Sequence, residues 1–426
     1  MSFAVLGLSF GIFLILSLSL SFNFTLSFFS QSFSQSDVQV VKYRNLTLDL
    51  GNGIQTKAQL SYPALGKGPF PGVLLIPGSG IADKNETIGV IHKNGPKPPS
   101  PLWQIAQYLS ERGFAILRFD KRGVGENHTI LDKNVWGNVT ANDLIQDSKK
   151  ALNVLIQQPE SDPKRISIIG HSEGTLYAPR VAIDNSMKVK NIILMGALAQ
   201  NPVKVLYYYQ VVTASSEYAA QVLDKNHTGM ISIYQIANDP FLSHIVVPFS
   251  ILHANNTKGI ATVLIKEFGT DGYISINKQL KPSLIRTYEN FTDPNSLKCN
   301  NLGPCQMWWR SINNLEPNVS IIGNVSKSIS ILILNGENDS QTPVQQAFLL
   351  QQRLAEVNHP DHMLITYPSL GHLFYPSSKW QTSLGPIQPY VLADLYSWLE
   401  AHSGFTHTLT SMPSPPYSPP SPSINP

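Results

Sequence analysis

The stretch Arg165-Ile166-Ser167-Ile168-Ile169-Gly170-His171-Ser172-Glu173-Gly174 decides the fold of this chain. Its first half is rich in β-branched residues and has the composition of a buried strand. Its second half follows the pattern Gly-x-Ser-x-Gly, and the next residues, Thr175-Leu176-Tyr177-Ala178, are typical of a helix. We therefore predict a sharp strand-to-helix turn that presents Ser172, with glycines where a side chain would clash with nearby backbone.

Two other side chains follow Ser172 in an informative order. Asp339 comes after the apolar run Ile331-Leu332-Ile333-Leu334, and His372 lies in a loop after a third short run that ends at Tyr367. A serine hydroxyl is unreactive at neutral pH unless a base takes its proton, and an acid must orient that base. The sequence thus predicts a catalytic triad in which Ser172 is the nucleophile, His372 the base and Asp339 the acid.

The predicted acid has one rival in the same loop. Glu337 stands two positions before Asp339 and follows the same apolar run. We prefer Asp339, because Thr342-Pro343 then begins the next helix at the expected place.

A serine nucleophile that attacks a carbonyl group also needs backbone N–H groups that point at the negative charge developing on the substrate oxygen. We expect one from Glu173, directly after the nucleophile, and one from Ser79 in the loop Pro77-Gly78-Ser79-Gly80. A phosphate-binding glycine loop is rejected because no Gly-Lys-Ser/Thr sequence follows. For the Glu173 side chain, two alternatives stay open: a local hydrogen bond or a contact with substrate. The loop 120–125 is expected to be structural and to lie near the site.

The composition limits the classes of protein to consider. The 426 residues, 42% of them apolar, suffice for one large domain with an insertion or for two domains. Charged residues make up 14%, and the formal net charge of +3 forms no basic stripe, which argues against a nucleic-acid partner. No metal or organic cofactor is implied. The two cysteines, Cys299 and Cys305, flank a turn-forming stretch, so we expect a local disulfide rather than a zinc site or a nucleophile.

Residues 1–36 contain no charged side chain and include an apolar segment long enough to cross a bilayer. We interpret them as a signal peptide or an N-terminal membrane anchor, although a basic start and a clear cleavage site are missing. Sequons for N-glycosylation favour an exported glycoprotein that is secreted or anchored to the outer face of the cell membrane. They lie at Asn45, Asn85, Asn127, Asn138, Asn226, Asn255, Asn290, Asn318, Asn324 and Asn338, the last too close to Asp339 to carry a glycan.

Predicted strands and helices alternate over residues 37–199, and the same pattern returns over residues 326–402. This alternation predicts a mostly parallel central sheet with helices on both faces. Within the first part, Asn142 is expected to cap an amphipathic helix that runs to about residue 157.

Residues 200–325 break the alternation and are predicted to form a helical lid or cap insertion. Its Trp308-Trp309 pair is expected either to line an acyl pocket or to fill the small core of the lid. Residues 403–426 form a Pro/Ser-rich tail that we expect to be disordered.

Taken together, the chain resembles the α/β-hydrolase superfamily, and most of all its serine-esterase and serine-aminopeptidase-like group. The resemblance covers about residues 40–200 and 326–402. It implies an α/β-hydrolase fold with an inserted helical lid domain, and cleavage of carboxylic esters, or of amides or peptides, through an acyl-enzyme. Many relatives have His, Gly and Asn where Pro77, Thr175 and Gly371 stand, but every triad member is kept. The motifs are Pro77-Gly78-Ser79-Gly80 with Asp83, the loop 120–125, the turn at Ser172, and Asn335-Gly336-Glu337-Asn338-Asp339 with His372; Trp308-Trp309-Arg310 resembles a late segment of the lid.

The leading interpretation is an exported serine hydrolase that acts on carboxylic esters of small molecules. A serine exopeptidase or amidase on the same scaffold, acting on short peptides, is the first alternative, and it would need an acidic cluster in the insertion to hold a substrate amine. A non-catalytic surface binding protein is the second, although such proteins usually lose a triad member. The acids available in the insertion are Glu217, Asp224, Asp239, Glu267, Asp271 and Glu289.

Overall fold

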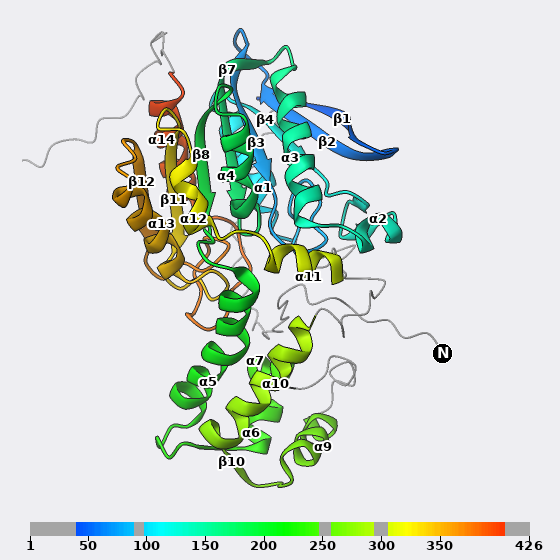
Figure 1. Cartoon of the computed structure of the whole chain (residues 1–426), viewed down its shortest axis with the longest axis vertical. Helices are drawn as coiled ribbons and strands as arrows, with labels where there is room; N and C mark the ends of the chain where they lie inside the picture. Colours follow the sequence, from blue (N-terminus) through cyan, green and yellow to red (C-terminus); the bar gives the residue numbers. More distant parts are fainter. Residues whose placement is uncertain (1–39, 89–97, 247–256, 294–305, 405–426) are drawn as a thin grey trace, which may run out of the picture.

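The computed structural model describes residues 40–88, 98–246, 257–293 and 306–404, and its central feature is an eight-stranded sheet (Figure 1). The strand order is β1-β2-β4-β3-β7-β8-β11-β12. Strands β1, β2 and β4 pair antiparallel, whereas all neighbours from β4 to β12 pair in parallel. The bounds are β1 Val41–Gly51, β2 Ile54–Pro63, β3 Phe70–Ile76, β4 Ala115–Phe119, β7 Ser161–His171, β8 Val189–Met195, β11 Ser330–Gly336 and β12 His362–Tyr367, with a separate pair formed by β5 Val124–Gly125 and β6 Thr129–Ile130.

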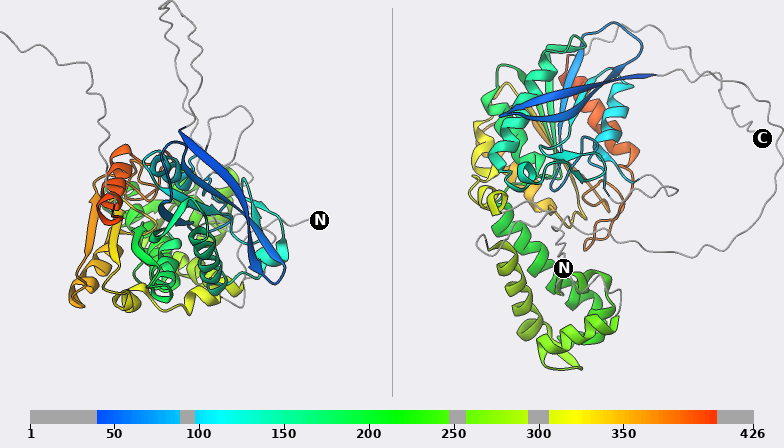
Figure 2. Two further views of the ribbon diagram at one scale, coloured as in Figure 1. Left: turned by 90° about the horizontal axis from the view of Figure 1, so that it is seen from above. Right: turned by 90° about the vertical axis from the view of Figure 1, so that its right-hand side faces the viewer.

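The side chains of the central strands alternate between two apolar layers. In β3, Val73 and Leu75 belong to one buried cluster, whereas Leu74 and Ile76 belong to the other. Because both faces are covered, such strands appear in the sequence as continuous apolar runs. The predicted mostly parallel sheet with helices on both faces is therefore confirmed, as Figure 2 also shows. Helices α1 Pro101–Ser110 and α14 Pro389–His402 cover the Val73 face, and α3 Ala141–Ile156, α4 Gly174–Asp184 and α13 Val344–Glu356 cover the other.

Helix α3 begins earlier than the sequence analysis expects. Thr140, not Asn142, is its N-cap. The Thr140 hydroxyl accepts the Asp143 N–H at 3.1 Å, and the Asp143 carboxylate accepts the Thr140 N–H at 2.9 Å. This reciprocal capping box satisfies two donors at once, which a cap at Asn142 would not do.

Between β8 and β11 the chain leaves the sheet and forms an insertion, whose described residues, 202–246, 257–293 and 306–324, are mostly helical. The bounds are η1 Pro202–Tyr207, η2 Tyr209–Ala214, α5 Ser215–Tyr218, η3 Ala219–Leu223, β9 Met230–Ser232, α6 Ile233–Asn238, α7 Pro240–Val246, α9 Thr257–Phe268, β10 Tyr273–Ser275, η4 Ile276–Leu280, α10 Lys281–Thr292, α11 Gln306–Asn313, α12 Asn318–Ile321 and η5 Ile322–Asn324; α2 Lys133–Gly137 lies outside the insertion. Figures 1 and 2 show its elements from α5 to α10 projecting from one end of the sheet, whereas α11 and α12 lie against the sheet domain. The insertion has an apolar cluster of its own, which includes Val212, Ile231, Leu264 and Leu284.

Several predictions concern residues that the structure does not describe. The apolar leader 1–36, both cysteines of the expected disulfide (Cys299 and Cys305) and nearly all of the tail 403–426 lie outside the described ranges. Of the helices that are described, none has both the length and the hydropathy needed to span a bilayer.

Candidate active site

Ser172 occupies the tight turn that joins the end of β7 to the start of α4. Its φ of 52° lies in the left-handed region, which non-glycine residues rarely adopt and which often marks a functional turn. A β-carbon built on Gly170 would lie 2.4 Å from the Gly174 carbonyl oxygen, and one built on Gly174 would lie 2.3 Å from the Ile76 carbonyl oxygen. Both flanking glycines are therefore required by close backbone contacts.

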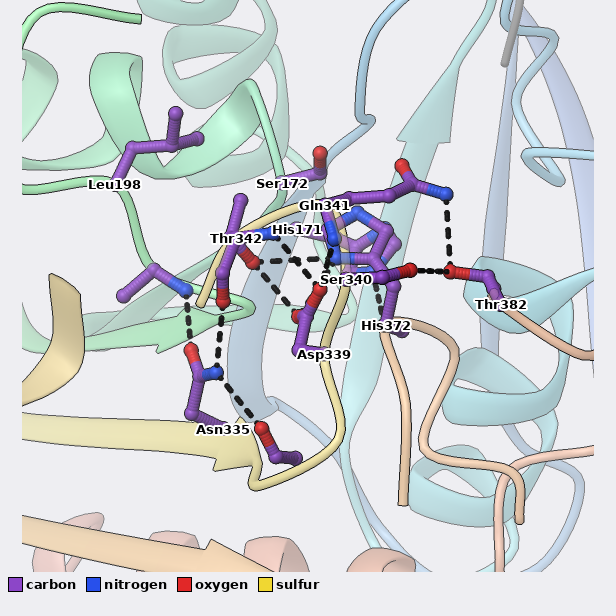
Figure 3. A network of polar contacts seen from close by, with 12 residues as sticks. His171, Ser172, Leu198, Asn335, Asp339, Ser340, Gln341, Thr342, His372 and Thr382 are labelled. Atoms are coloured by element: carbon purple, nitrogen blue, oxygen red, sulfur yellow. Dashed lines mark hydrogen bonds and ion pairs between the residues drawn. The ribbon is translucent and has the colours of Figure 1, made fainter. Parts of the chain in front are cut away.

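Asp339 and His372 are brought together by the loops that follow β11 and β12 (Figure 3). The Asp339 Oδ2 atom lies 2.8 Å from His372 Nδ1, and both side chains are buried. Asp339 Oδ1 accepts the N–H groups of Gln341 and Thr342 at 2.8 Å each, and the Thr342 hydroxyl donates to Oδ2 at 2.7 Å. A carboxylate with this many donors is held in one orientation, from which it can accept a hydrogen bond from His372 Nδ1.

The rival acid, Glu337, lies elsewhere. Its side chain is exposed, and its carboxylate accepts a hydrogen bond from the Thr366 hydroxyl at 2.9 Å. The structure thus places Asp339, and not Glu337, beside His372. Among the described residues, the Ser172 hydroxyl makes no hydrogen bond to the His372 ring, although such contacts often tighten only when substrate binds.

A second buried histidine, His171, lies beside His372, and no local sequence pattern indicates it. The rings of His171 and His372 are 5.0 Å apart between centroids. His171 Nδ1 faces Glu86 Oε1 at 2.9 Å, and its Nε2 faces the His372 carbonyl oxygen at 3.2 Å. A carboxylate and a carbonyl oxygen both accept hydrogen bonds, so this geometry allows both ring nitrogens of His171 to donate. Burial by itself lowers the pKa of His171, but the Glu86 carboxylate, the His372 carbonyl oxygen and the charge of Asp339 together outweigh burial, and the pKa is raised.

The Glu173 side chain hydrogen-bonds to neighbouring protein groups, which is the first of the two roles left open above. Its carboxylate accepts from Lys121 Nζ at 2.7 Å, from Trp308 Nε1 at 2.8 Å and from the Tyr177 hydroxyl. All of these groups are buried. The carboxylate is thus an anchor for its surroundings and is not available to a substrate in this arrangement.

The two adjacent tryptophans do not fill the core of the insertion, which was one of the two roles expected for them; a role in an acyl pocket stays a prediction. Trp308 and Trp309 are buried in the apolar cluster that lies between the sheet and helices α3 and α4, and not in the cluster of the insertion. Trp309 also packs edge-on against Tyr207, with 4.9 Å between ring centroids. Helix α11 is therefore attached to the sheet domain through these side chains, because their apolar area is buried there.

The loop Pro77-Gly78-Ser79-Gly80, predicted to supply one oxyanion donor, lies against the nucleophile. A β-carbon built on Gly78 would lie 3.0 Å from the Ser172 β-carbon. Ser79, the next residue, is exposed. The predicted donor Glu173 follows Ser172 directly and is the N-cap residue of α4.

The loop 120–125 is structural, and it carries an unusual acid. Arg122 makes two hydrogen bonds to Asp147 of α3, at 2.6 and 2.7 Å, and thereby ties the loop to the helix layer. Asp120 is fully buried and accepts the Lys84 N–H at 2.6 Å, while Asp120 Oδ2 has no partner among the described residues. Burial raises the pKa of Asp120 to about 6.

Comparisons with known proteins match part of this chain to a hydrolase family and to curated relatives. The family described as "Serine aminopeptidase, S33" matches residues 102–254, a region that contains Ser172 but not Asp339 or His372. Esterase EstD of Thermotoga maritima is 31% identical over 153 residues, which are 36% of this chain and 30% of that protein. The uncharacterized protein YfhR of Escherichia coli O157:H7 is 29% identical over 169 residues, which are 39% of this chain and 54% of that protein.

The chain thus spans from about a third to about half the length of these two relatives. Among solved structures, the α/β hydrolase GrgF from Penicillium sp. sh18 matches with a TM-score of 0.49 and 15% identity, over 85% of this chain and 100% of that one. The strand order of the sheet, the strand-to-helix turn at Ser172 and the sequence matches together place the chain in the α/β-hydrolase superfamily.

Proposed function

We propose that the protein is a serine hydrolase that cleaves carboxylic esters through an acyl-enzyme, with Ser172 as nucleophile, His372 as base and Asp339 as the acid that orients the base. The observation that carries this proposal is the 2.8 Å contact between Asp339 Oδ2 and His372 Nδ1, made at the strand ends that also present Ser172. An imidazole whose Nδ1 proton is fixed presents its Nε2 as a base.

The reaction has two steps, formation of the acyl-enzyme and its hydrolysis by water. The Ser172 oxygen attacks the ester carbonyl while His372 Nε2 takes the hydroxyl proton, and the N–H groups of Ser79 and Glu173 hold the negative oxygen that forms. The tetrahedral intermediate then expels the alcohol, which receives its proton from His372. Water attacks the acyl-enzyme with His372 again acting as base, and the acid is released as Ser172 regains its proton.

The state of the acids in the insertion supports an ester substrate over a peptide with a free amine. Asp224 accepts the N–H groups of Thr228 and Gly229, Asp239 accepts the N–H of Leu242 at the start of α7, and Glu267 pairs with Arg286. These carboxylates are engaged within the insertion. The other three candidate acids, Glu217, Asp271 and Glu289, are exposed on its surface.

We further propose that the insertion covers the site as a lid. Two contacts support this role: Trp308 of α11 donates to Glu173, next to the nucleophile, and Gln210 of η2 donates to the Gln341 carbonyl oxygen at 2.6 Å, next to the acid loop. Ser172, His372 and Asp339 are all buried. A covered site excludes water and strengthens the electrostatic interactions within it.

Export by way of the leader 1–36, with release or anchorage at the outer face of the membrane, is also part of the proposal. Most sequon asparagines that the structure describes are exposed, as a glycoprotein requires. The exposed ones are Asn45, Asn127, Asn138, Asn226, Asn290 and Asn324.

A substrate panel tests the proposed chemistry. The full chain and its Ser172→Ala variant would be assayed with 4-nitrophenyl esters of several acyl lengths and with aminoacyl 4-nitroanilides. We expect a higher kcat/KM for esters, and loss of that activity in the variant. A higher kcat/KM for the anilides would favour the exopeptidase alternative, and a folded protein that turns over neither class would favour the binding-protein alternative.

A further inference from the structure

Gly78 lies at the centre of a buried network of charged side chains beside Ser172. Its N–H donates to Glu86 Oε1 at 2.8 Å, and its carbonyl oxygen accepts from Lys121 Nζ at 2.6 Å. The residue before the predicted donor Ser79 is therefore held at both of its backbone polar groups. Glu86 and Lys121 are only 6% and 3% exposed, so both charged groups are held away from water.

The same two side chains also hold the residues on either side of the nucleophile. Glu86 pairs with His171, which precedes Ser172, at 2.9 Å. Lys121 pairs with Glu173, which follows Ser172, at 2.7 Å. Each charged side chain thus joins Gly78 to one neighbour of Ser172, and we call this set of Glu86, His171, Lys121 and Glu173 the clamp.

We propose that Glu86 and Lys121 are positioning residues that fix the oxyanion loop relative to Ser172, an inference that rests on the proposed hydrolase function. The peptide unit between Gly78 and Ser79 shows how. This unit is planar and trans, so its C=O and its N–H point in opposite directions. Because Lys121 holds the carbonyl end, the Ser79 N–H is directed away from Lys121 and cannot turn freely. The positive charge at the carbonyl also polarises the peptide, which makes the N–H a stronger donor.

Stability alone is a weak reason for such a network. Burying charges is costly, and apolar side chains of similar volume often replace a buried ion pair without loss of stability. With His171 protonated, the clamp holds two negative and two positive charges and is neutral overall. Its distinctive property is geometric, because it sets the distance between a donor loop and a nucleophile turn that belong to different strands. Preorganised donors of this kind carry much of the catalytic effect in acyl transfer.

The same loop offers a matched control. Arg122 is the residue after Lys121, and it forms a buried ion pair with Asp147 of α3. Its hydrogen bonds go to Asp147 and Asp143, and not to Gly78 or to a neighbour of Ser172. Arg122→Met therefore removes a buried charge from the loop without removing a contact of the clamp.

The experiment compares Lys121→Met with Arg122→Met in the full chain, with rates expressed per site titrated by a fluorophosphonate. For Lys121→Met we expect kcat/KM for the best ester to fall about 10- to 100-fold, as for other outer-shell positioning groups. The affinity for a trifluoromethyl ketone, which forms a tetrahedral adduct on serine, should fall by the same factor. For Arg122→Met we expect a lower Tm, with the per-site rate and the inhibitor affinity within about twofold of wild type.

Glu86 supplies an independent check by conservative rescue. Glu86→Gln keeps an oxygen that can accept the Gly78 N–H, so most of the per-site rate should remain. Glu86→Leu removes the acceptor and should lose rate and trifluoromethyl ketone affinity together. Equal behaviour of the two variants would contradict a positioning role for the Gly78 contact.

The inference can still be tested if Lys121→Met fails to fold. If Lys121→Met does not fold because Glu173 is left unpaired, Lys121→Met/Glu173→Gln removes both charges and carries the same expectation. Wild-type rate and inhibitor affinity in that variant, or in Lys121→Met, would overturn the inference and leave the proposed function intact. A wild-type protein that neither hydrolyses esters nor reacts with the fluorophosphonate would instead overturn the proposed function, and the role of the clamp with it.

Discussion

Gly196, the residue that follows β8, lies directly against the ring of His372. A β-carbon built on Gly196 would lie 3.1 Å from His372 Cε1 and 3.2 Å from Nδ1. These distances are shorter than nearly all contacts that real β-carbons make. The ring of the proposed base, His372, thus needs the space that the missing side chain of Gly196 leaves, in addition to its contact with Asp339.

Gly196→Ala should therefore displace the His372 ring and lower kcat by about tenfold or more, because small misplacements of a catalytic group are costly. Gly196 also has a φ of +62°, so part of any stability loss will come from the backbone. Gly269→Ala is the control, since Gly269 has a φ of +69° and no atom within 4 Å of its added β-carbon. Stability measured by urea unfolding should fall in both variants, and activity only in the first. Unchanged kcat in Gly196→Ala would show that the ring tolerates the displacement.

Asp339→Asn should reduce kcat by about four orders of magnitude without unfolding the protein, as the same substitution does in the triad of a serine protease. The amide cannot hold the proton on His372 Nδ1 as the carboxylate does, so Nε2 ceases to be the available base. Glu337→Gln, in the same loop, should leave kcat unchanged, because the Glu337 side chain is exposed and, among the described residues, hydrogen-bonds only the Thr366 hydroxyl. Steady-state measurement of kcat for both variants and wild type tests which residue is the acid. A large loss of kcat in Glu337→Gln with none in Asp339→Asn would reverse the assignment.

Asp120 should make stability depend on pH in the acid range. Its pKa is about 6 in the folded protein against an ordinary value of 3.8. A raised carboxyl pKa means that the folded state binds the proton more tightly, so the free energy of unfolding falls as the pH rises from about 4 through 6. The difference corresponds to about 3 kcal/mol between the protonated and the charged limits.

Asp120→Asn removes the contribution of Asp120 to the pH dependence of the free energy of unfolding. Comparing the variant with wild type therefore separates this contribution from that of the other titrating groups. Urea unfolding at several pH values should show wild type losing stability relative to Asp120→Asn between pH 4 and pH 7. A difference between the two proteins that stays constant over this range would mean that Asp120 titrates normally.

The sequons should be used selectively if the chain is exported. Asn318 is fully buried, and its amide donates to the Thr175 and Leu198 carbonyl oxygens at 2.8 Å each, so a glycan there is incompatible with the fold. Asn45 is exposed on β1 and should carry one. Peptide mapping after enzymatic deglycosylation in heavy-oxygen water would detect each occupied site as a labelled aspartate. Occupancy at Asn318 in folded protein would contradict the structure at that point.

The sheet and the nucleophile turn were predictable because their signals are local in the sequence. Strand β3 is a continuous apolar run, and the turn at Ser172 joins a β-branched strand to a helix through two glycines that backbone contacts require. The relation between Asp339 and His372 follows from a further rule, since the ends of adjacent parallel strands, here β11 and β12, meet at one edge of the sheet.

The clamp was not predictable, because each of its contacts joins distant parts of the chain. Glu86 and His171 are 85 positions apart, and Lys121 and Glu173 are 52 positions apart. Locally, Asp83-Lys84-Asn85-Glu86 has the composition of a hydrated surface turn, so its burial has no signal in the sequence. The contact of Trp308 with Glu173 spans 135 positions and was missed for the same reason.

The central claim is that Ser172 is an activated nucleophile. The most direct measurement is reaction of the full chain with a fluorophosphonate, followed by mass-spectrometric mapping of the modified residue, in wild type and in Ser172→Ala. We expect one modified residue, Ser172, and no labelling of the folded variant. Labelling at another serine, or a folded wild-type protein that does not react at all, would contradict the claim.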